Sequence, residues 1–158
     1  MTVSDIRKDF PILRKKIHGN DLVYFDNGAS AQKPEKVIEV IQSCYRNEYS
    51  NVHRGLHYLS NNLTDKFEEA REKIQVYLGA KDSSEIVFTS GSTEALNIVA
   101  HSWGANNLRE GDEIILSVME HHSNIVPWHF LREKIGIKII WADINSKGIL
   151  EIDEVIKK

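Results

Sequence analysis

The chain has 158 residues, with 20 lysines and arginines against 23 aspartates and glutamates, and a net charge of −3. This balance argues against a nucleic-acid-binding protein, which carries a basic excess, and 27% charged with 41% apolar residues is ordinary globular usage. No apolar run reaches the ~20 residues that span a bilayer, the first residues lack a signal peptide's apolar core, and one cysteine, Cys44, allows no internal disulfide. We therefore expect a cytoplasmic protein that binds neither nucleic acid nor membrane.

The first half of the chain is predicted to be mainly helical. Its expected elements are a short helix capped by Ser4 and ending before Pro11, a strand at Leu22–Phe25, a turn at Asp26–Ser30, a helix from Pro34 to about Tyr45, and a helix from Leu63 to Leu78 capped by Gly79. The two longer helices follow from apolar residues that recur at helical spacing. We assign residues 1–80 to an N-terminal helical segment.

From residue 81 onward the pattern changes to alternating strands and helices. It predicts strands at Ile86–Phe88, Ile114–Leu116 and Ile137–Trp141, helices from Gly91 through Trp103 and from Ile125 to Lys134, and a further helix from about Ile152. Because the apolar runs of these strands lack clean alternation, both faces of the sheet are expected to be covered. Residues 81–158 are thus predicted to begin an α/β domain with a mainly parallel sheet.

The segment Thr89–Ala95 is the first that suggests chemistry. It joins a predicted strand to a predicted helix, so that free backbone N–H groups, small residues and hydroxyls meet at a helix N-terminus, which suits a phosphate. It is neither a Walker loop nor a dinucleotide-binding Gly-x-Gly-x-x-Gly. The alternative is a simple capping arrangement, with Ser92 or Ser90 as the N-cap and an acidic residue nearby.

A histidine-containing segment, Met119–Asn124, follows the next predicted strand, at the end where open α/β sheets bind ligands. His121 there could stack on an aromatic cofactor, bind a metal, act as an acid or base, or simply cap a helix. The pair His53 and His57 has no glutamate at the position that zinc proteases use, so we predict no metal site. Cys44 falls on the apolar face of its helix, which is typical of a buried, inert thiol.

Four segments occur in an order that points to one family. They are Asp26-Asn27-Gly28-Ala29-Ser30-Ala31-Gln32-Lys33-Pro34, Val52-His53-Arg54-Gly55-Leu56-His57-Tyr58-Leu59-Ser60, Ser90-Gly91-Ser92-Thr93-Glu94, and Met119-Glu120-His121-His122-Ser123-Asn124-Ile125-Val126-Pro127-Trp128. With them the chain closely resembles the N-terminal part of SufS-type (group II) cysteine desulfurases, which are class V aminotransferase-fold enzymes that use pyridoxal 5′-phosphate (PLP). The second and fourth segments are far more specific than the third.

The resemblance implies a role for five residues. Ser92 and Thr93 would bind the PLP phosphate, and His121 would lie over the pyridine ring and assist proton movements. Ala29 and His53 would line the substrate side near a homodimer interface. The resemblance further implies conversion of L-cysteine to L-alanine, with the sulfur passing as a persulfide to a SufE- or SufU-type acceptor protein for iron–sulfur cluster assembly, in the first part of a fold-type-I large domain.

Two residues that the family needs have no match in this sequence. The family carries its Schiff-base lysine in a Ser-x-His-Lys context, and its persulfide cysteine lies toward its C-terminus; neither motif occurs here. We therefore expect the chain to be an N-terminal fragment that is inactive alone.

Two alternatives to this interpretation remain open. The first is another class V PLP enzyme, such as a selenocysteine lyase, a kynureninase-like enzyme or an aminotransferase. The second is a non-catalytic α/β module that binds a phosphate at the turn Gly91–Glu94.

Overall fold

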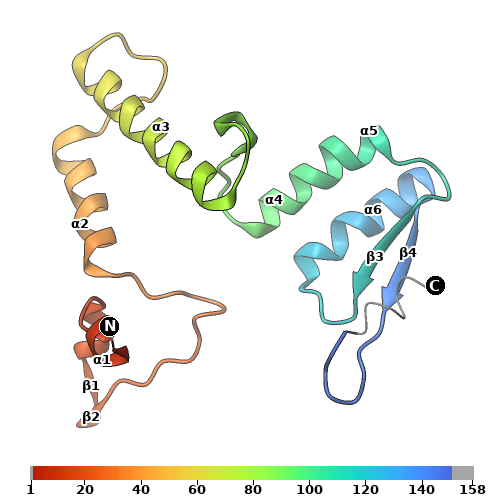
Figure 1. The fold of residues 1–158 in the computed structure, drawn as a ribbon, viewed down its shortest axis with the longest axis horizontal. Helices are drawn as coiled ribbons and strands as arrows, with labels where there is room; N and C mark the ends of the chain where they lie inside the picture. The colour runs from red at the N-terminus through yellow and green to blue at the C-terminus, as the bar shows by residue number, and fades with distance from the viewer. Residues whose placement is uncertain (1, 151–158) are drawn as a thin grey trace. The chain divides into compact units, whose positions relative to one another are not determined.

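The computed structural model describes residues 2–150, which belong to two compact units, Met1–Ile86 and Val87–Lys158 (Figure 1). The boundary predicted from the sequence lies between residues 80 and 81. The helix predicted from Ile152 lies outside the described residues. No helix among the residues that the structure describes is long and apolar enough to cross a membrane.

The first unit begins with α1 (Val3–Arg7), the short 3-10 helix η1 (Pro11–Arg14) and a hairpin of β1 (Lys16–Ile17) and β2 (Asn20–Asp21). Thr2, rather than the predicted Ser4, caps α1. Its hydroxyl accepts from the Asp5 backbone N–H at 3.3 Å while the Asp5 carboxylate accepts from the Thr2 N–H at 3.0 Å. This reciprocal capping box satisfies two N–H groups, which a cap at Ser4 would not do.

The predicted strand Leu22–Phe25 does not form. The hairpin ladder ends where the Leu22 N–H donates to the Lys15 carbonyl at 3.1 Å, and beyond it Phe25 is 95% exposed. A strand requires a neighbouring strand to complete its hydrogen bonds, and within residues 2–150 this segment has none. The predicted turn at Asp26–Ser30 is confirmed, since the Ala29 and Ser30 N–H groups both donate to the Asp26 carbonyl.

The two predicted long helices are confirmed. The first is α2 (Glu35–Ser43), which continues as the π-helix η2 (Cys44–Glu48), and the second is α3 (Tyr58–Leu78). The α3 helix ends at Gly79, whose φ of 71° is readily adopted only by glycine. The loop 49–57 joins η2 to α3 (Figure 1), and the 3-10 helix η3 (Ser83–Glu85) follows α3.

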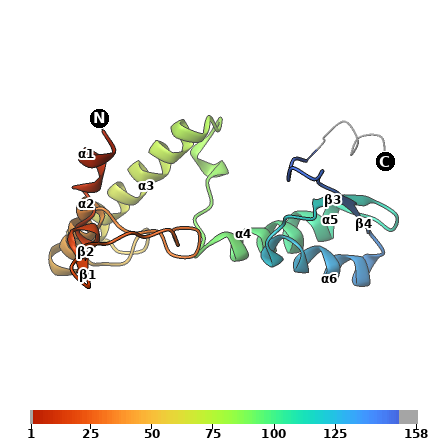
Figure 2. The same ribbon diagram turned by 90° about the horizontal axis from the view of Figure 1, so that it is seen from below.

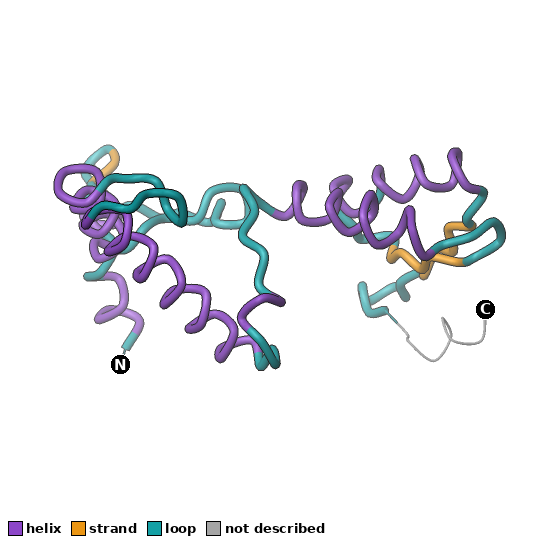
Figure 3. Tube along the Cα trace, turned by 90° about the horizontal axis from the view of Figure 1, so that it is seen from above, coloured by secondary structure: helices purple, strands orange, loops and turns teal. Residues whose placement is uncertain are grey.

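The second unit is a helical run followed by a β–α–β arrangement (Figures 2 and 3). Its elements in chain order are α4 (Ser92–Val99), the π-helix η4 (Ala100–Gly104), α5 (Ala105–Asn107), β3 (Glu113–Ser117), the 3-10 helix η5 (His122–Asn124), α6 (Val126–Ile135) and β4 (Lys138–Ala142). The strands β3 and β4 pair in parallel, in register from Glu113 with Lys138 to Ser117 with Ala142. The predicted α/β class and these two strands are confirmed.

The prediction of a strand at Ile86–Phe88 is wrong, because within the described residues neither β3 nor β4 pairs with this segment. Its apolar residues are extended without a ladder, and Val87 is 68% exposed. Apolar β-branched residues favour a strand but do not supply the neighbour that completes one.

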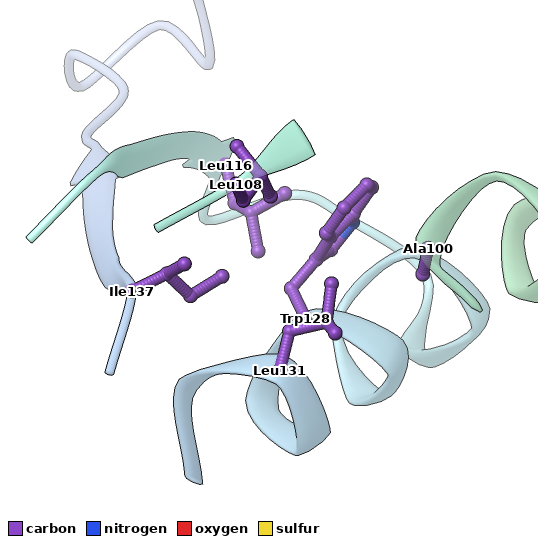
Figure 4. Close-up of a cluster of buried hydrophobic side chains, with 6 residues drawn as sticks. All are labelled: Ala100, Leu108, Leu116, Trp128, Leu131 and Ile137. Carbon is purple, nitrogen blue, oxygen red and sulfur yellow. The ribbon is translucent and has the colours of Figure 1, made fainter. Parts of the chain in front are cut away.

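The core of the second unit lies between the helices and the β3–β4 pair (Figure 4). Its buried cluster consists of Ala100, Leu108, Leu116, Trp128, Leu131 and Ile137. Helix α6 contributes Trp128 and Leu131, the strand β3 contributes Leu116, and η4 contributes Ala100. The cluster therefore ties α6 to the strand that leads into the His121 segment.

Candidate functional site

The N-terminus of α4 offers hydrogen-bond donors without a capping side chain. Gly91 is the N-cap, and no side chain caps the helix. The capping alternative, which expected Ser92 or Ser90 as the N-cap, is therefore wrong on this point. The first N–H groups of a helix have no intrahelical partner, and here they belong to Ser92 and Thr93, both exposed. A side chain added at Gly91 would meet no atom within 4 Å, so an anion has open access to this helix end.

Glu94, the third residue of α4, contacts the same turn. Its carboxylate accepts from the Ser90 backbone N–H at 2.5 Å and from the Ser90 hydroxyl at 2.7 Å. The backbone bond from Ser90, followed by the hydroxyl bond, lowers the pKa of the Glu94 carboxyl below its usual value. The donors of Ser90 are therefore engaged by a carboxylate, whereas those of Ser92 and Thr93 are available to a ligand.

His121 acts as the N-cap of η5. Its Nδ1 accepts from the Ser123 backbone N–H at 3.2 Å and lies 2.9 Å from the Ser123 hydroxyl. An Nδ1 that accepts a hydrogen bond places the proton of the neutral ring on Nε2. The helix-capping role that the sequence left open for His121 is thus present, and it leaves the exposed Nε2 edge of the ring available for chemistry.

A hydrogen-bonded network fixes the backbone on both sides of His121. The Glu120 carboxylate accepts from the Ser117 hydroxyl at 2.9 Å and from the Asn124 amide at 2.9 Å, and the Asn124 oxygen accepts from the buried Trp128 indole N–H at 3.1 Å. The bond from Asn124, followed by that from Ser117, lowers the pKa of the Glu120 carboxyl. The end of β3 and the start of α6 are therefore joined across the His121 segment.

In the second unit, the helix that follows residues 89–91 is in contact with the segment that carries His121. Helix α4, which begins with Ser92 and Thr93, packs against η5, which His121 caps. The η5 segment follows the carboxyl end of β3 in the chain. This is the edge at which open α/β sheets place ligands.

The other two predicted residues, Ala29 and His53, belong to the first unit. Ala29 lies in the turn that the Asp26 carbonyl closes, and the Tyr24 hydroxyl donates to the Ser30 carbonyl at 2.7 Å across that turn. The arrangement holds the backbone of a small, exposed residue in a fixed bend.

His53 is held in an unusual conformation by helix α3. Its φ of 67° is rare for a residue with a side chain. Its backbone N–H donates to the Thr64 hydroxyl at 2.9 Å, its Nε2 lies 3.1 Å from Glu68 Oε1, and its ring meets the edge of the Phe67 ring at 5.7 Å between centroids. Residues 64, 67 and 68 occupy one face of α3, so a single helical face fixes both the backbone and the ring.

The sequence predicted no role for Glu68 and Glu120, whereas Glu94 is the acidic residue that the capping alternative placed near Ser90. Glu94 and Glu120 lie inside the quoted motifs, and their adjacency to Thr93 and His121 was the available signal. Glu68 lies fifteen positions after His53 in a regular helix, where the sequence alone gives no sign of a partner.

The first unit also contains a cavity of about 1060 Å³ between α2, η2, the loop 49–57 and α3. Its lining is mainly apolar and aromatic and includes Cys44, which is half-buried and carries no disulfide. Over the residues that the structure describes, no group of three or more histidine, cysteine or acidic side chains could hold a metal ion.

The fold is that of an α/β protein whose helix α4 begins without a capping side chain. The class-V aminotransferase family profile matches residues 23–158, and the chain belongs to that family. It is 44% identical over 155 residues to a cysteine desulfurase of Synechococcus elongatus, covering 98% of this chain and 25% of that protein.

Two solved structures share the fold of this chain. The apo cysteine desulfurase of Thermococcus onnurineus NA1 superposes with a TM-score of 0.87 at 37% identity, covering 100% of this chain and 38% of that one. A structure titled C-DES mutant K223A, with glycine covalently linked to the PLP cofactor, shares the fold with a TM-score of 0.67 at 22% identity, covering 87% of this chain and 33% of that one. The chain thus spans between a quarter and two fifths of the length of these proteins.

Proposed function

We propose that residues 1–158 form the phosphate-binding and ring-facing part of a PLP-dependent cysteine desulfurase of the SufS type. The observation that carries the proposal is that α4, whose N-terminus has no capping side chain, contacts η5 within a chain that resembles cysteine desulfurases over nearly its whole length. The exposed N–H groups and hydroxyls of Ser92 and Thr93 match the acceptor oxygens of a phosphate, and Gly91 leaves room for it. These residues therefore fit the group.

His121 is the residue proposed to face the ring of the bound cofactor. PLP, when bound, supplies an electron sink for the substrate amino acid. His121 keeps its Nδ1 on Ser123, so its imidazole is oriented and its Nε2 can hold or move a proton. The network from Ser117 through Glu120 and Asn124 to Trp128 holds the segment in place.

Ala29 and His53 are proposed to line the substrate side, with L-cysteine as the substrate. In the overall reaction the Cβ–S bond of cysteine breaks, an S–S bond forms to an enzyme thiol, and the substrate carbon takes up a proton to give L-alanine. We propose that the cofactor-binding lysine and the thiol come from polypeptide outside residues 1–158, because the chain spans 25% and 38% of the two cysteine desulfurases it was compared with. A homodimer, a SufE- or SufU-type sulfur acceptor, iron–sulfur cluster assembly and a cytoplasmic location complete the proposal.

A chimaera tests the proposal directly. Residues 1–158 replace the matching first part of the Thermococcus onnurineus enzyme, and alanine and sulfide release from L-cysteine are measured with PLP and a reductant. We expect a folded, PLP-containing chimaera that releases both products. A chimaera that folds but retains no PLP contradicts the phosphate assignment, and one that retains PLP without releasing alanine favours another class V reaction.

Single substitutions in the chimaera test the phosphate residues. Thr93→Ala removes a hydroxyl at the start of α4. Because a hydrogen bond to a charged group contributes about 1.5–3 kcal/mol, the variant should bind PLP roughly tenfold or more weakly. Ser102→Ala is the matched control, since that hydroxyl donates to the Ile98 carbonyl within the same helical run. Pyridoxal, which lacks the phosphate, should bind both variants equally. Equal PLP affinity of the two variants would contradict the assignment.

A further inference from the structure

We propose that Glu68 is the positioning residue of His53, fixing which ring nitrogen carries the proton and how the ring lies. The inference deepens the proposed function and rests on it, because it assigns how the substrate-side histidine is prepared. It starts from the closest polar contact of the ring, 3.1 Å between His53 Nε2 and Glu68 Oε1.

The backbone of His53 is set independently of its ring. A φ of 67° is disfavoured for any residue other than glycine and persists only where neighbouring groups impose it. The imposing group is the Thr64 hydroxyl, which accepts from the His53 N–H at 2.9 Å and itself donates to the Ser60 carbonyl at 2.7 Å. Strained residues of this kind concentrate at functional sites.

The chemistry of the contact determines the tautomer. An ionised carboxylate only accepts hydrogen bonds, so the ring nitrogen that faces Glu68 must carry a hydrogen. The neutral His53 ring is therefore protonated on Nε2, and its Nδ1 is an acceptor. A carboxylate that orients a histidine in this way is the arrangement that fixes histidine ligands and bases in other sites.

Glu68 is itself held in place from its other side. Its second oxygen, Oε2, lies 3.0 Å from Arg71 Nε, while another nitrogen of the Arg71 guanidinium donates to the Ile86 carbonyl. The guanidinium also lies over the Phe67 ring at 5.1 Å, and the edge of that ring contacts His53. Each carboxylate oxygen therefore has its own partner, and the helix supports the orientation of the histidine from two sides.

The functional consequence is a defined acceptor on the substrate side. With Nε2 facing the Glu68 carboxylate, His53 would offer the lone pair of Nδ1 to a donor group. L-Cysteine carries two such groups, its ammonium and its thiol. Glu68 would thus set the binding of the amino acid without touching it.

Nitrogen NMR of the full 158-residue chain labelled with ¹⁵N-histidine tests the assignment. The His53 signals are identified by their loss in His53→Gln, and the ratio of the two neutral tautomers is read from the nitrogen shifts. We expect mainly the Nε2–H form in the unsubstituted chain. In Glu68→Ala that preference should fall by roughly two- to fivefold, as the loss of one half-exposed polar contact with a carboxylate implies. In Glu68→Gln, which keeps an acceptor oxygen, it should fall less.

The adjacent Glu69 provides the matched control. Its carboxylate pairs with Lys73 at 2.6 Å on the same helix, so Glu69→Gln removes an equal charge without contacting His53. An unchanged tautomer ratio in Glu68→Ala, an equal change in Glu69→Gln, or an Nδ1–H form in the unsubstituted chain would overturn the proposal. Helix content by circular dichroism accompanies each variant, and if Glu68→Ala loses helix, the isosteric Glu68→Gln decides.

Kinetics of the chimaera give a second measurement that does not depend on the chain's behaviour in isolation. Glu68→Ala should raise KM for L-cysteine more than it lowers kcat, and Glu68→Gln should recover part of the loss, whereas Glu69→Gln should change neither constant. Unchanged KM in Glu68→Ala contradicts the positioning role even if the chimaera is active. An inactive chimaera with the expected tautomer ratios instead contradicts the proposed function alone.

Discussion

Replacing Leu131 with alanine should destabilise the second unit more than any exposed substitution on the same helix. Leu131 is 1% exposed and belongs to the buried cluster that ties α6 to β3 and η4. A methyl group built at Gly104 would lie 2.8 Å from Leu131 Cδ1, so the leucine fills the space directly over a helix backbone without a side chain. Backbone cannot easily move into the vacated space.

The expected cost follows from this geometry. Buried Leu→Ala changes cost about 2–5 kcal/mol, with larger values where the site cannot collapse, so we expect about 3–5 kcal/mol. For a unit of this size each kcal/mol shifts the melting temperature by about 4–8 °C, which gives a decrease of at least about 12 °C. All three tryptophans of the chain, Trp103, Trp128 and Trp141, lie in the second unit, so tryptophan fluorescence during urea unfolding reports on that unit alone.

The control and a double variant make this prediction refutable. Val126→Ala, at a 42% exposed position on the same helix, should change stability by less than about 0.5 kcal/mol. Gly104→Ala alone should destabilise by about 1–3 kcal/mol through overpacking, whereas combined with Leu131→Ala its methyl enters the vacated space and the two costs should be less than additive. A Leu131→Ala shift no larger than that of Val126→Ala, or strict additivity, would refute the reasoning.

Two further predictions concern the loops that carry the site residues. The folded-state pKa of Glu120 is lowered from 4.5, so the stability that its ionised carboxylate contributes is present above that pH and is lost as the pH falls through the lowered value. The urea midpoint, followed by tryptophan fluorescence, should therefore decline less on acidification in Glu120→Gln than in the unsubstituted chain. An identical decline in both would contradict this prediction. In Gly55→Ala the new Cβ would lie 2.4 Å from the Cβ of the buried Ser60, so the loop must shift. Trypsin should then cleave after Arg54 faster than in the unsubstituted chain. Gly28→Ala, where a new Cβ meets no atom within 4 Å, should leave that cleavage rate unchanged.

The sequence predicted the local elements well where local physics decides them. Gly79 and Gly136 end α3 and α6 at positive φ, as expected for glycine after an apolar helical pattern. The strands predicted around residues 115 and 139 do form, because the helix between them in the chain allows the two to pair in parallel. The predicted strands at Leu22–Phe25 and Ile86–Phe88 did not form in the described chain, since a strand depends on a partner that its own residues do not specify.

The sequence by itself determined the α/β class, the helix start after Gly91 and the position of the His121 segment, because motifs, apolar periodicity and helix-ending glycines act over a few residues. Only the tertiary structure showed that η5 packs against α4, that Glu120 and Trp128 fix the His121 segment, and that Glu68 holds His53. These contacts join residues whose spacing in the chain follows no local rule. They form only when helices and loops pack against one another.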